Sequence, residues 1–305
     1  MNEAFHEGER TLQQIVGVRE KLAALGPRLI RDFMPEQHQQ FFAQLPFVLV
    51  SAVDAEGQPW ASVLANPPGF IDSPDPRLLV VRARPATIDP INMGLVTGAP
   101  VGLLGIEPHT RRRNRANGIV ESVFDDGFIV HVRQSFGNCP KYIHARKAKY
   151  VTTESASTKT IEQFRQLDAE AKQLILRADT FFIATAYPPG GGYSEAEQGI
   201  DVSHRGGPPG FVRVNSDNTL SVPDFIGNSF FNTLGNIALN PRAGLLFIDF
   251  ESGDLLYLAV DASIIWDESA EIETRESTKR LLRFYVREMR RAKASLPLRW
   301  EQARG

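Results

Sequence analysis

The stretch Pro67-Pro68-Gly69-Phe70 decides the fold, because it recurs as Pro208-Pro209-Gly210-Phe211. The two copies lie 141 residues apart, counted from Gly69 to Gly210. Two further pairs of apolar segments recur in the same order, at offsets of 134 and 142 residues: Phe47–Val50 with Phe181–Ala184, and Gly102–Glu107 with Gly244–Asp249. Three matches in one order indicate an internal duplication.

Both halves show the same predicted order of elements. A helical segment comes first, and short apolar strands follow without the β–α–β alternation of a parallel sheet. The predicted helices are Pro35–Gln44 and Ile161–Arg177, and the predicted strands are Phe47–Ala52, Leu78–Arg82, Val101–Ile106, Thr180–Thr185, Leu220–Val222, Ala243–Phe250 and Leu255–Trp266. This pattern predicts a mainly β fold with flanking helices, built from two small tandem β-barrels.

Two predicted features distinguish the halves. The first half has an additional hairpin, formed by Ile119–Val123 and Phe128–Arg133. The second half ends in Ser277–Ala294, whose apolar residues fall at helical spacing and predict a basic amphipathic helix. We expect that helix to pack on a barrel with its charges in water.

Composition narrows the class of protein. The 305 residues carry 34 basic and 36 acidic side chains, and this formal net charge of −2 disfavours a nucleic-acid binder. The single cysteine, Cys139, excludes an intrachain disulfide. The N-terminus is polar and no apolar run approaches the ~20 residues of a membrane helix, so we expect a cytoplasmic protein without membrane contact.

Common catalytic motifs are missing from the sequence. It contains no G-x-x-x-x-G-K-[ST], H-E-x-x-H or G-x-S-x-G motif, and its six histidines lack metal-ligand spacing. We therefore predict no metal site and identify no catalytic side chain.

Two polar segments in the second half can bind an anion. In Asp201–Phe211, the step Ser203-His204-Arg205 precedes glycines that let a ligand approach closely, although a solvated arginine in a turn is the simpler reading. In Pro223–Asn236, small donors precede a predicted helix, where they suit both capping and phosphate binding. The candidate residues of this second segment are Pro223, Asp224, Asn228, Asn232 and Thr233.

The second half resembles the pyridoxamine 5'-phosphate oxidase-like, FMN-binding split-barrel superfamily, and within it the predicted flavin-nucleotide-binding proteins. The resemblance covers roughly residues 160–270, and the first half resembles the superfamily more loosely. It rests on Ala178–Thr185, Asp201–Phe211, Pro223–Phe225, Gly227-Asn228, Thr233–Asn236 and Asn240–Phe250, and in the first half on Thr110–Gly118 and Phe136–Ile143.

The resemblance implies two tandem split barrels, with FMN bound where barrels meet. Residues 1–155 would form a diverged barrel with a helical N-terminal extension, and residues 156–305 an FMN-binding barrel with a C-terminal helix. Arg205 stands where the family places a phosphate-binding arginine. The family usually has Arg or Lys and a hydroxyl at the following helix start, but Asn232 and Thr233 stand there here.

The implied function is that of an FMN-dependent oxidoreductase with an unknown substrate. Its partners would be a small-molecule electron donor or acceptor, NAD(P)H being one candidate, and a second copy of the chain in a homodimer. The alternatives are a flavin carrier or sensor that does not turn over, a haem-handling split barrel, and an anion- or nucleic-acid-binding module. FMN is the expected cofactor if the protein is the oxidoreductase or the flavin carrier.

The duplication also predicts where the halves differ. An offset of 141 places Ser62 opposite Ser203 but Leu64 opposite Arg205, so we expect the first half to have lost the equivalent flavin site. Lys141 is a further candidate for a phosphate or flavin contact. The run Arg111–Arg115 is expected on the last strand of the first barrel, with its odd-numbered arginines on one face, as an anion site or a solvated surface.

Overall fold

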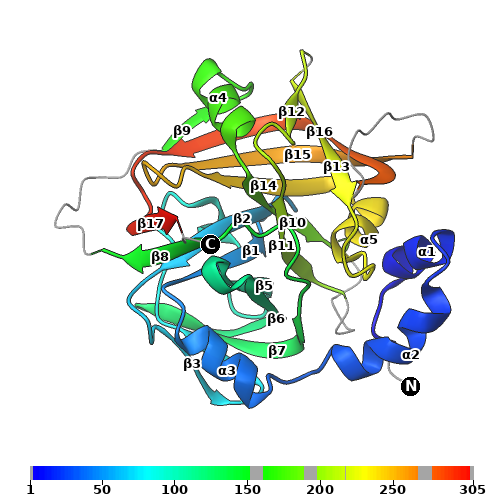
Figure 1. The fold of residues 1–305 in the computed structure, drawn as a ribbon. Helices are drawn as coiled ribbons and strands as arrows, with labels where there is room; N and C mark the ends of the chain where they lie inside the picture. The colour runs from blue at the N-terminus through cyan, green and yellow to red at the C-terminus, as the bar shows by residue number, and fades with distance from the viewer. Residues whose placement is uncertain (1–2, 152–160, 189–197, 217, 267–276, 303–305) are drawn as a thin grey trace.

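The chain folds into two antiparallel sheets with matching topology (Figure 1). The structure is a computed structural model that describes residues 3–151, 161–188, 198–216, 218–266 and 277–302. Strand order is β2-β1-β5-β6-β7-β4-β3 in the first sheet and β11-β10-β14-β15-β16-β13-β12 in the second. Each strand of the first sheet therefore has a counterpart in the second, which confirms the predicted mainly β fold and its internal duplication.

The strands of the first sheet lie between residues 47 and 137. They are β1 (Phe47–Val53), β2 (Pro59–Ala65), β3 (Ile71–Asp75), β4 (Leu78–Val81), β5 (Pro100–Glu107), β6 (Arg112–Phe124) and β7 (Gly127–Gly137). The second sheet contains β9 (Ile161–Phe164), β10 (Thr180–Ala186), β11 (Ile200–Gly206), β12 (Arg213–Val214), β13 (Thr219–Phe225), β14 (Arg242–Ile248), β15 (Leu255–Trp266) and β16 (Ser277–Ala292).

Strand register fixes the correspondence between the halves. Val50 pairs with Ser62 in the first sheet, and Ile183 pairs with Ser203 in the second. Ser62 and Ser203 are thus equivalent, as the repeat predicts, and by the same register Leu64 is equivalent to Arg205. The first strands, β1 and β10, however, are related by an offset of 133 residues, and the offset of 134 expected from the sequence is wrong. An unbroken apolar run offers no polar residue to fix its alignment, so the two runs were matched one residue out of register.

The C-terminal segment is strand β16, so the predicted amphipathic helix over Ser277–Ala294 is wrong. Leu282, Phe284 and Val286 alternate with more exposed residues and point into the core, which is the period of a strand. The β6–β7 hairpin of the first half is then the counterpart of β15–β16 and not an additional one. Likewise, the predicted helix Ile161–Arg177 divides into strand β9 and helix α4 (Ala169–Arg177).

Short helices lie around the sheets. Besides α4, they are α1 (Glu7–Ile15), α2 (Arg19–Leu29), α3 (Glu36–Ala43), α5 (Asn232–Leu239) and the 3₁₀ turns η1 (Pro90–Met93) and η2 (Pro108–Thr110). No helix among the described residues is long and apolar enough to span a membrane. The predicted boundary at residues 155 and 156 lies outside the described residues, and beyond it the C-terminal strand β17 (Leu298–Gln302) pairs with β8 (Arg146–Tyr150).

The two barrels meet through equivalent glycines. A Cβ atom on Gly102 would lie 2.6 Å from the Ile200 carbonyl oxygen, and one on Gly244 would lie 2.3 Å from the Pro59 carbonyl oxygen. Gly102 and Gly244 pair with equivalent residues of β1 and β10, so each barrel presents its glycine to the neighbouring strand of the other. This reciprocal contact relates the barrels by an approximate twofold axis and brings β6 of the first half against β11 of the second.

Candidate functional site

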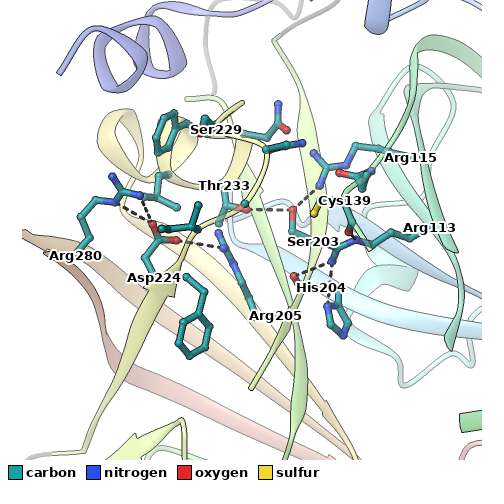
Figure 2. Close-up of a pocket in the computed structure, with 18 of the residues that line it drawn as sticks. Arg113, Arg115, Cys139, Ser203, His204, Arg205, Asp224, Ser229, Thr233 and Arg280 are labelled. Atoms are coloured by element: carbon teal, nitrogen blue, oxygen red, sulfur yellow. Dashed lines mark hydrogen bonds and ion pairs between the residues drawn. The ribbon is translucent and has the colours of Figure 1, made fainter. Parts of the chain in front are cut away.

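A cavity of about 300 Å³ lies between the two barrels. Its walls come from β6 and the segment after β7 in the first half, and from β11, β13, α5 and β16 in the second (Figure 2). Val16 and Val18, which lie between α1 and α2, complete it. The cavity is therefore assembled from segments that are far apart in the sequence.

Four arginines project into this cavity. Arg113 and Arg115 come from β6 in the first half, whereas Arg205 and Arg280 come from β11 and β16 in the second (Figure 2). Because side chains on a strand alternate between its faces, Arg113 and Arg115 share one face, as predicted. Arg111 does not extend this row, because it lies in a left-handed turn at φ 55° before β6 begins. Moreover, β6 is followed by β7, so it is not the last strand of its barrel.

The arginines outnumber the described carboxylates that pair with them. Arg115 Nη1 lies 2.7 Å from Asp201 Oδ1. Asp224 is shared, since its oxygens lie 3.3 Å from Arg205 Nη1 and 2.8 Å from Arg280 Nη2. Arg113 forms no salt bridge to any described carboxylate; its Nε donates to the Cys139 carbonyl oxygen at 2.8 Å, and its Nη1 lies 3.1 Å from His204 Nδ1. The cavity thus carries an excess of positive charge.

The pKa shifts reflect this excess. Burial, together with the neighbouring Arg115 and Arg205, lowers the pKa of Arg113 to about 10. Burial likewise lowers the pKa of Arg205, although Asp224 partly opposes the shift. The pKa of His204 is well below its ordinary value, first because the ring is buried and then because Arg113 lies beside it, so His204 is neutral at pH 7. A bound anion would relieve all three groups.

Three buried donors in the cavity wall have no hydrogen-bond partner in the described part of the chain: Arg115 Nε, Arg205 Nε and Asn138 Nδ2. Leaving such a group unsatisfied costs about 1–3 kcal/mol, and more for a charged one. All three are N–H groups, so the group that would satisfy them is an acceptor. An anion rich in oxygen atoms fits this requirement.

Helix α5 directs its first turn toward the same cavity. Its cap residue Phe231 has a left-handed backbone, at φ 66°, and no described side chain caps the helix. The first N–H groups of a helix lack partners within it and favour negative charge. Nearby, Thr233 Oγ1 donates to Ser203 Oγ at 3.1 Å, and Arg115 Nη2 also donates to Ser203, so β11, α5 and β6 meet at one hydroxyl.

Most of the predicted site residues line this cavity, namely Ser203, His204, Arg205, Asp224, Asn228, Asn232 and Thr233. Pro223 and Lys141 do not; Lys141 is exposed on the segment after β7, whereas Asn138 and Cys139 of that segment do reach the wall. Arg280 is not among the predicted site residues, because it lies in the segment that was predicted to be a helix. For Arg113 and Arg115 the sequence does not decide between an anion site and a solvated surface. Strand alternation predicts that they share a face, but it does not predict that the other barrel lies against that face.

An equivalent position exists on the other side of the twofold axis, but its chemistry differs. A cavity of about 130 Å³ there is lined by Leu64, Leu255 and Tyr257, which replace Arg205, Arg113 and Arg115. Tyr257 Oη donates to the buried Asp89 at 3.0 Å, and Ser62 Oγ donates to the same oxygen at 2.5 Å. The hydroxyls in this second cavity therefore donate to the protein's own carboxylate, Asp89, at the position where the first cavity would bind an anion.

Comparison with known proteins gives partial matches to solved structures. No protein-family model matches the chain, and no curated protein matches it. Among solved structures, a single-residue variant of HupZ from Group A Streptococcus is 18% identical, covers 40% of this chain and 96% of its own, and has a TM-score of 0.31. HutZ, the heme storage protein from Vibrio cholerae, is 15% identical over 42% of this chain and 95% of its own, with a TM-score of 0.29.

A third similar structure comes from Clostridium acetobutylicum. It is a protein of the pyridoxinephosphate oxidase family, related to general stress protein 26 of B. subtilis. It is 13% identical over 44% of this chain and 92% of its own, with a TM-score of 0.28.

Proposed function

We propose that the cavity between the barrels binds FMN and that the protein is an FMN-dependent oxidoreductase. The observation that carries this proposal is the set of four inward arginines, balanced among the described residues by only Asp201 and Asp224, with unpartnered N–H groups between them. A phosphate monoester supplies the missing charge and the missing acceptor oxygens in one group.

The residues present fit the phosphate of this cofactor. Arg205, Arg113 and Arg115 would hold it, and the uncapped first turn of α5 would add N–H donors. Arg113 and Arg115 come from the opposite barrel, so they replace the basic residue that the resemblance leads one to expect at Asn232. Val16, Val18 and Phe231 offer an apolar wall for the rest of the ligand.

When bound, FMN would supply the electron-transfer chemistry, and the protein's side chains would bind and orient it. Neutral His204 would remain a hydrogen-bonding group next to Arg113 without gaining a charge. Ser203 and Thr233, which are hydrogen-bonded to each other, would offer hydroxyls to the same ligand.

Absorption spectroscopy and two titrations test the proposal. We expect the purified protein to be yellow, or to take up added FMN, and to bind FMN at least tenfold more tightly than riboflavin, which lacks the phosphate. Arg205→Ala should weaken FMN binding and leave riboflavin binding unchanged, whereas Arg283→Ala, an exposed arginine on β16, should change neither.

Failure to bind FMN would overturn the proposal, and a Soret band in the purified protein would identify a haem protein instead. Reduction of the bound flavin by NADH or NADPH, followed by reoxidation with an added acceptor, would support the oxidoreductase. Bound flavin that no such donor reduces would identify a carrier or sensor.

A further inference from the structure

The N-terminal segment from Phe5 to Val18, which we call the N-terminal arm, packs on helix α5 (Figure 1). Gln13 Nε2 donates to the Phe230 carbonyl oxygen at 3.1 Å, and the rings of Phe5 and Phe230 lie 5.5 Å apart. His6 is buried and accepts from the Gly8 N–H as the cap of α1. The arm is thus a fixed part of the second half, although it begins the chain.

The contact between α1 and α5 depends on two glycines. A Cβ atom on Gly8 would lie 2.3 Å from the Gly235 carbonyl oxygen, and one on Gly235 would lie 2.6 Å from Glu9 Cγ. The helix backbones therefore approach so closely that no side chain fits between them. A larger residue at position 8 would lift the arm without changing any residue of the cavity.

The arm reaches the cavity at its C-terminal end. Val16 and Val18 line the wall, whereas the arginines and unpartnered donors belong to the two barrels. The two residues that the arm adds to the wall are thus apolar, whereas the barrels supply all of the charged groups and further apolar residues such as Phe231. A ligand that uses both must have an anionic end and an apolar body.

Glu9 joins the arm to the binding site. Its carboxylate is buried, accepts from Asn232 Nδ2 at 2.5 Å at the start of α5, and accepts from the His6 backbone N–H at 2.9 Å. Burial, with Asp201 nearby, raises the pKa of Glu9 well above its ordinary value, while Arg115 opposes that shift. Glu9 thus holds Asn232, the first residue of the helix that faces the ligand.

We propose that the N-terminal arm is part of the ligand-binding site: Val16 and Val18 cover the apolar body of the bound flavin, and Glu9 is the positioning residue that fixes the arm to the first turn of α5. This inference rests on the proposed function, because it takes flavin as the ligand. It adds that the barrels bind the phosphate, and that the arm, together with Phe231, contacts the ring system.

Three ligands separate these roles: FMN, riboflavin and inorganic phosphate. Gly8→Val should weaken the binding of FMN and of riboflavin by about tenfold each, mainly through faster dissociation, and leave inhibition by phosphate unchanged. Gln14→Val, which places the same side chain on the exposed face of α1, should match the wild type. Arg205→Ala should show the complementary pattern, with loss of FMN and phosphate binding but not of riboflavin binding.

The outcomes distinguish the two proposals. Unchanged flavin binding by Gly8→Val, with a normal response of Arg205→Ala, would overturn the role of the arm and leave the FMN site standing. Failure of the wild type to bind flavin would overturn both. If Gly8→Val does not fold, Val18→Ser replaces it, because that change alters the apolar wall without disturbing the glycine contact; equal loss of FMN and riboflavin binding is again expected.

The positioning role of Glu9 has its own test. Glu9→Ala should accelerate FMN dissociation about as much as Gly8→Val, because Asn232 loses its acceptor. Glu9→Gln keeps one oxygen that can accept from Asn232, although its NH2 group replaces the oxygen that accepts from the His6 N–H, so it should restore part of the slow wild-type dissociation. Equal rates for Glu9→Ala and the wild type, or no rescue by Glu9→Gln, would overturn this role.

Discussion

Arg115 and Tyr257 occupy the same position in the two barrels, and each reaches the equivalent serine of the other barrel. Arg115 pairs with Leu104 across β5 and β6, as Tyr257 pairs with Leu246 across β14 and β15. Arg115 donates to Ser203, and Tyr257 Oη lies 3.4 Å from Ser62 Oγ. The duplication has thus kept the geometry of two sites around one axis while their charges diverged.

This relationship predicts one FMN per chain. The second cavity has Leu64, Leu255 and Tyr257 in place of three arginines, and Asp89 would repel a phosphate there. Isothermal titration calorimetry with FMN should therefore give a stoichiometry of one FMN per chain. Two sites of comparable affinity would contradict this prediction.

A variant that adds a positive charge to the second cavity gives a stronger test that this cavity binds no FMN. Leu64→Arg restores the one cation whose loss is visible in the sequence repeat, but it leaves Leu255, Tyr257 and Asp89 in place. We expect the stoichiometry to stay at one. Arg205→Leu, the reciprocal change in the functional cavity, should weaken the single site by one to two orders of magnitude, in line with about 1.5–3 kcal/mol for a hydrogen bond to a charged group.

Arg113→Met should weaken FMN binding without weakening the fold. Arg113 forms no salt bridge to a described carboxylate, and its lowered pKa of about 10 shows that its environment disfavours the cation. Replacing such a group with an apolar side chain is often neutral or stabilising, so the free energy of unfolding without ligand should stay constant or rise by about 1 kcal/mol. FMN affinity should nevertheless fall at least tenfold.

Chemical denaturation and fluorescence titration check the two effects separately. Arg283→Met, an exposed arginine given the same substitution, should leave both quantities at their wild-type values. A loss of stability that accounts for the loss of affinity would show that Arg113 supports the fold and not the ligand.

The architecture could be predicted because the two halves of the sequence share recognisable repeated segments. The recurrence of Pro67–Phe70 as Pro208–Phe211 located equivalent turns, and strand register agrees that Ser62 and Leu64 correspond to Ser203 and Arg205. Most residues chosen around Arg205 line one cavity, since β11 and the start of α5 carry them in two short runs.

The rest of the site could not be predicted from the sequence, because it depends on contacts between segments that are far apart in the chain. Arg113 and Arg115 enter the cavity only through the approach of the barrels, which no local pattern encodes. Arg280 was assigned to a helix because Leu281, Leu282, Tyr285 and Met289 have helical spacing, although the alternation of Leu282, Phe284 and Val286 in the same segment favours a strand. Burial of Glu9 likewise requires the packing of α1 on α5.

The glycines at the barrel interface predict a strong effect of a single methyl group. Gly102→Ala and Gly244→Ala would each place a Cβ atom within 2.6 Å or less of a backbone carbonyl oxygen of the opposite barrel. Because backbone cannot move aside cheaply, we expect each variant to lose about 1–3 kcal/mol or more of unfolding free energy and to bind FMN more weakly. Gly199→Ala, where the added Cβ would have no described atom within 4 Å apart from its chain neighbours, should be neutral; equal behaviour of all three variants would contradict the interface.

His38 should make the protein less stable in acid. It is buried on α3 and bonded to Ser135 Oγ at 2.9 Å, and its pKa is lowered to about 4 by burial first and then by Arg112 and Arg31. Between pH 6.5 and about 4 the unfolded chain binds a proton there that the folded chain does not, so stability falls as pH falls. The loss from this one group is at most about 1.4 kcal/mol per pH unit.

His38→Gln should therefore flatten the dependence of unfolding free energy on pH between 6.5 and 4, measured by urea denaturation at several pH values. His6, whose pKa is also lowered to about 4, keeps its own acid sensitivity in the variant, and the raised pKa values of Glu9 and Asp89 give stability that declines as pH rises. These contributions are common to both proteins and cancel in the difference. A His38→Gln curve parallel to that of the wild type would disprove the assignment.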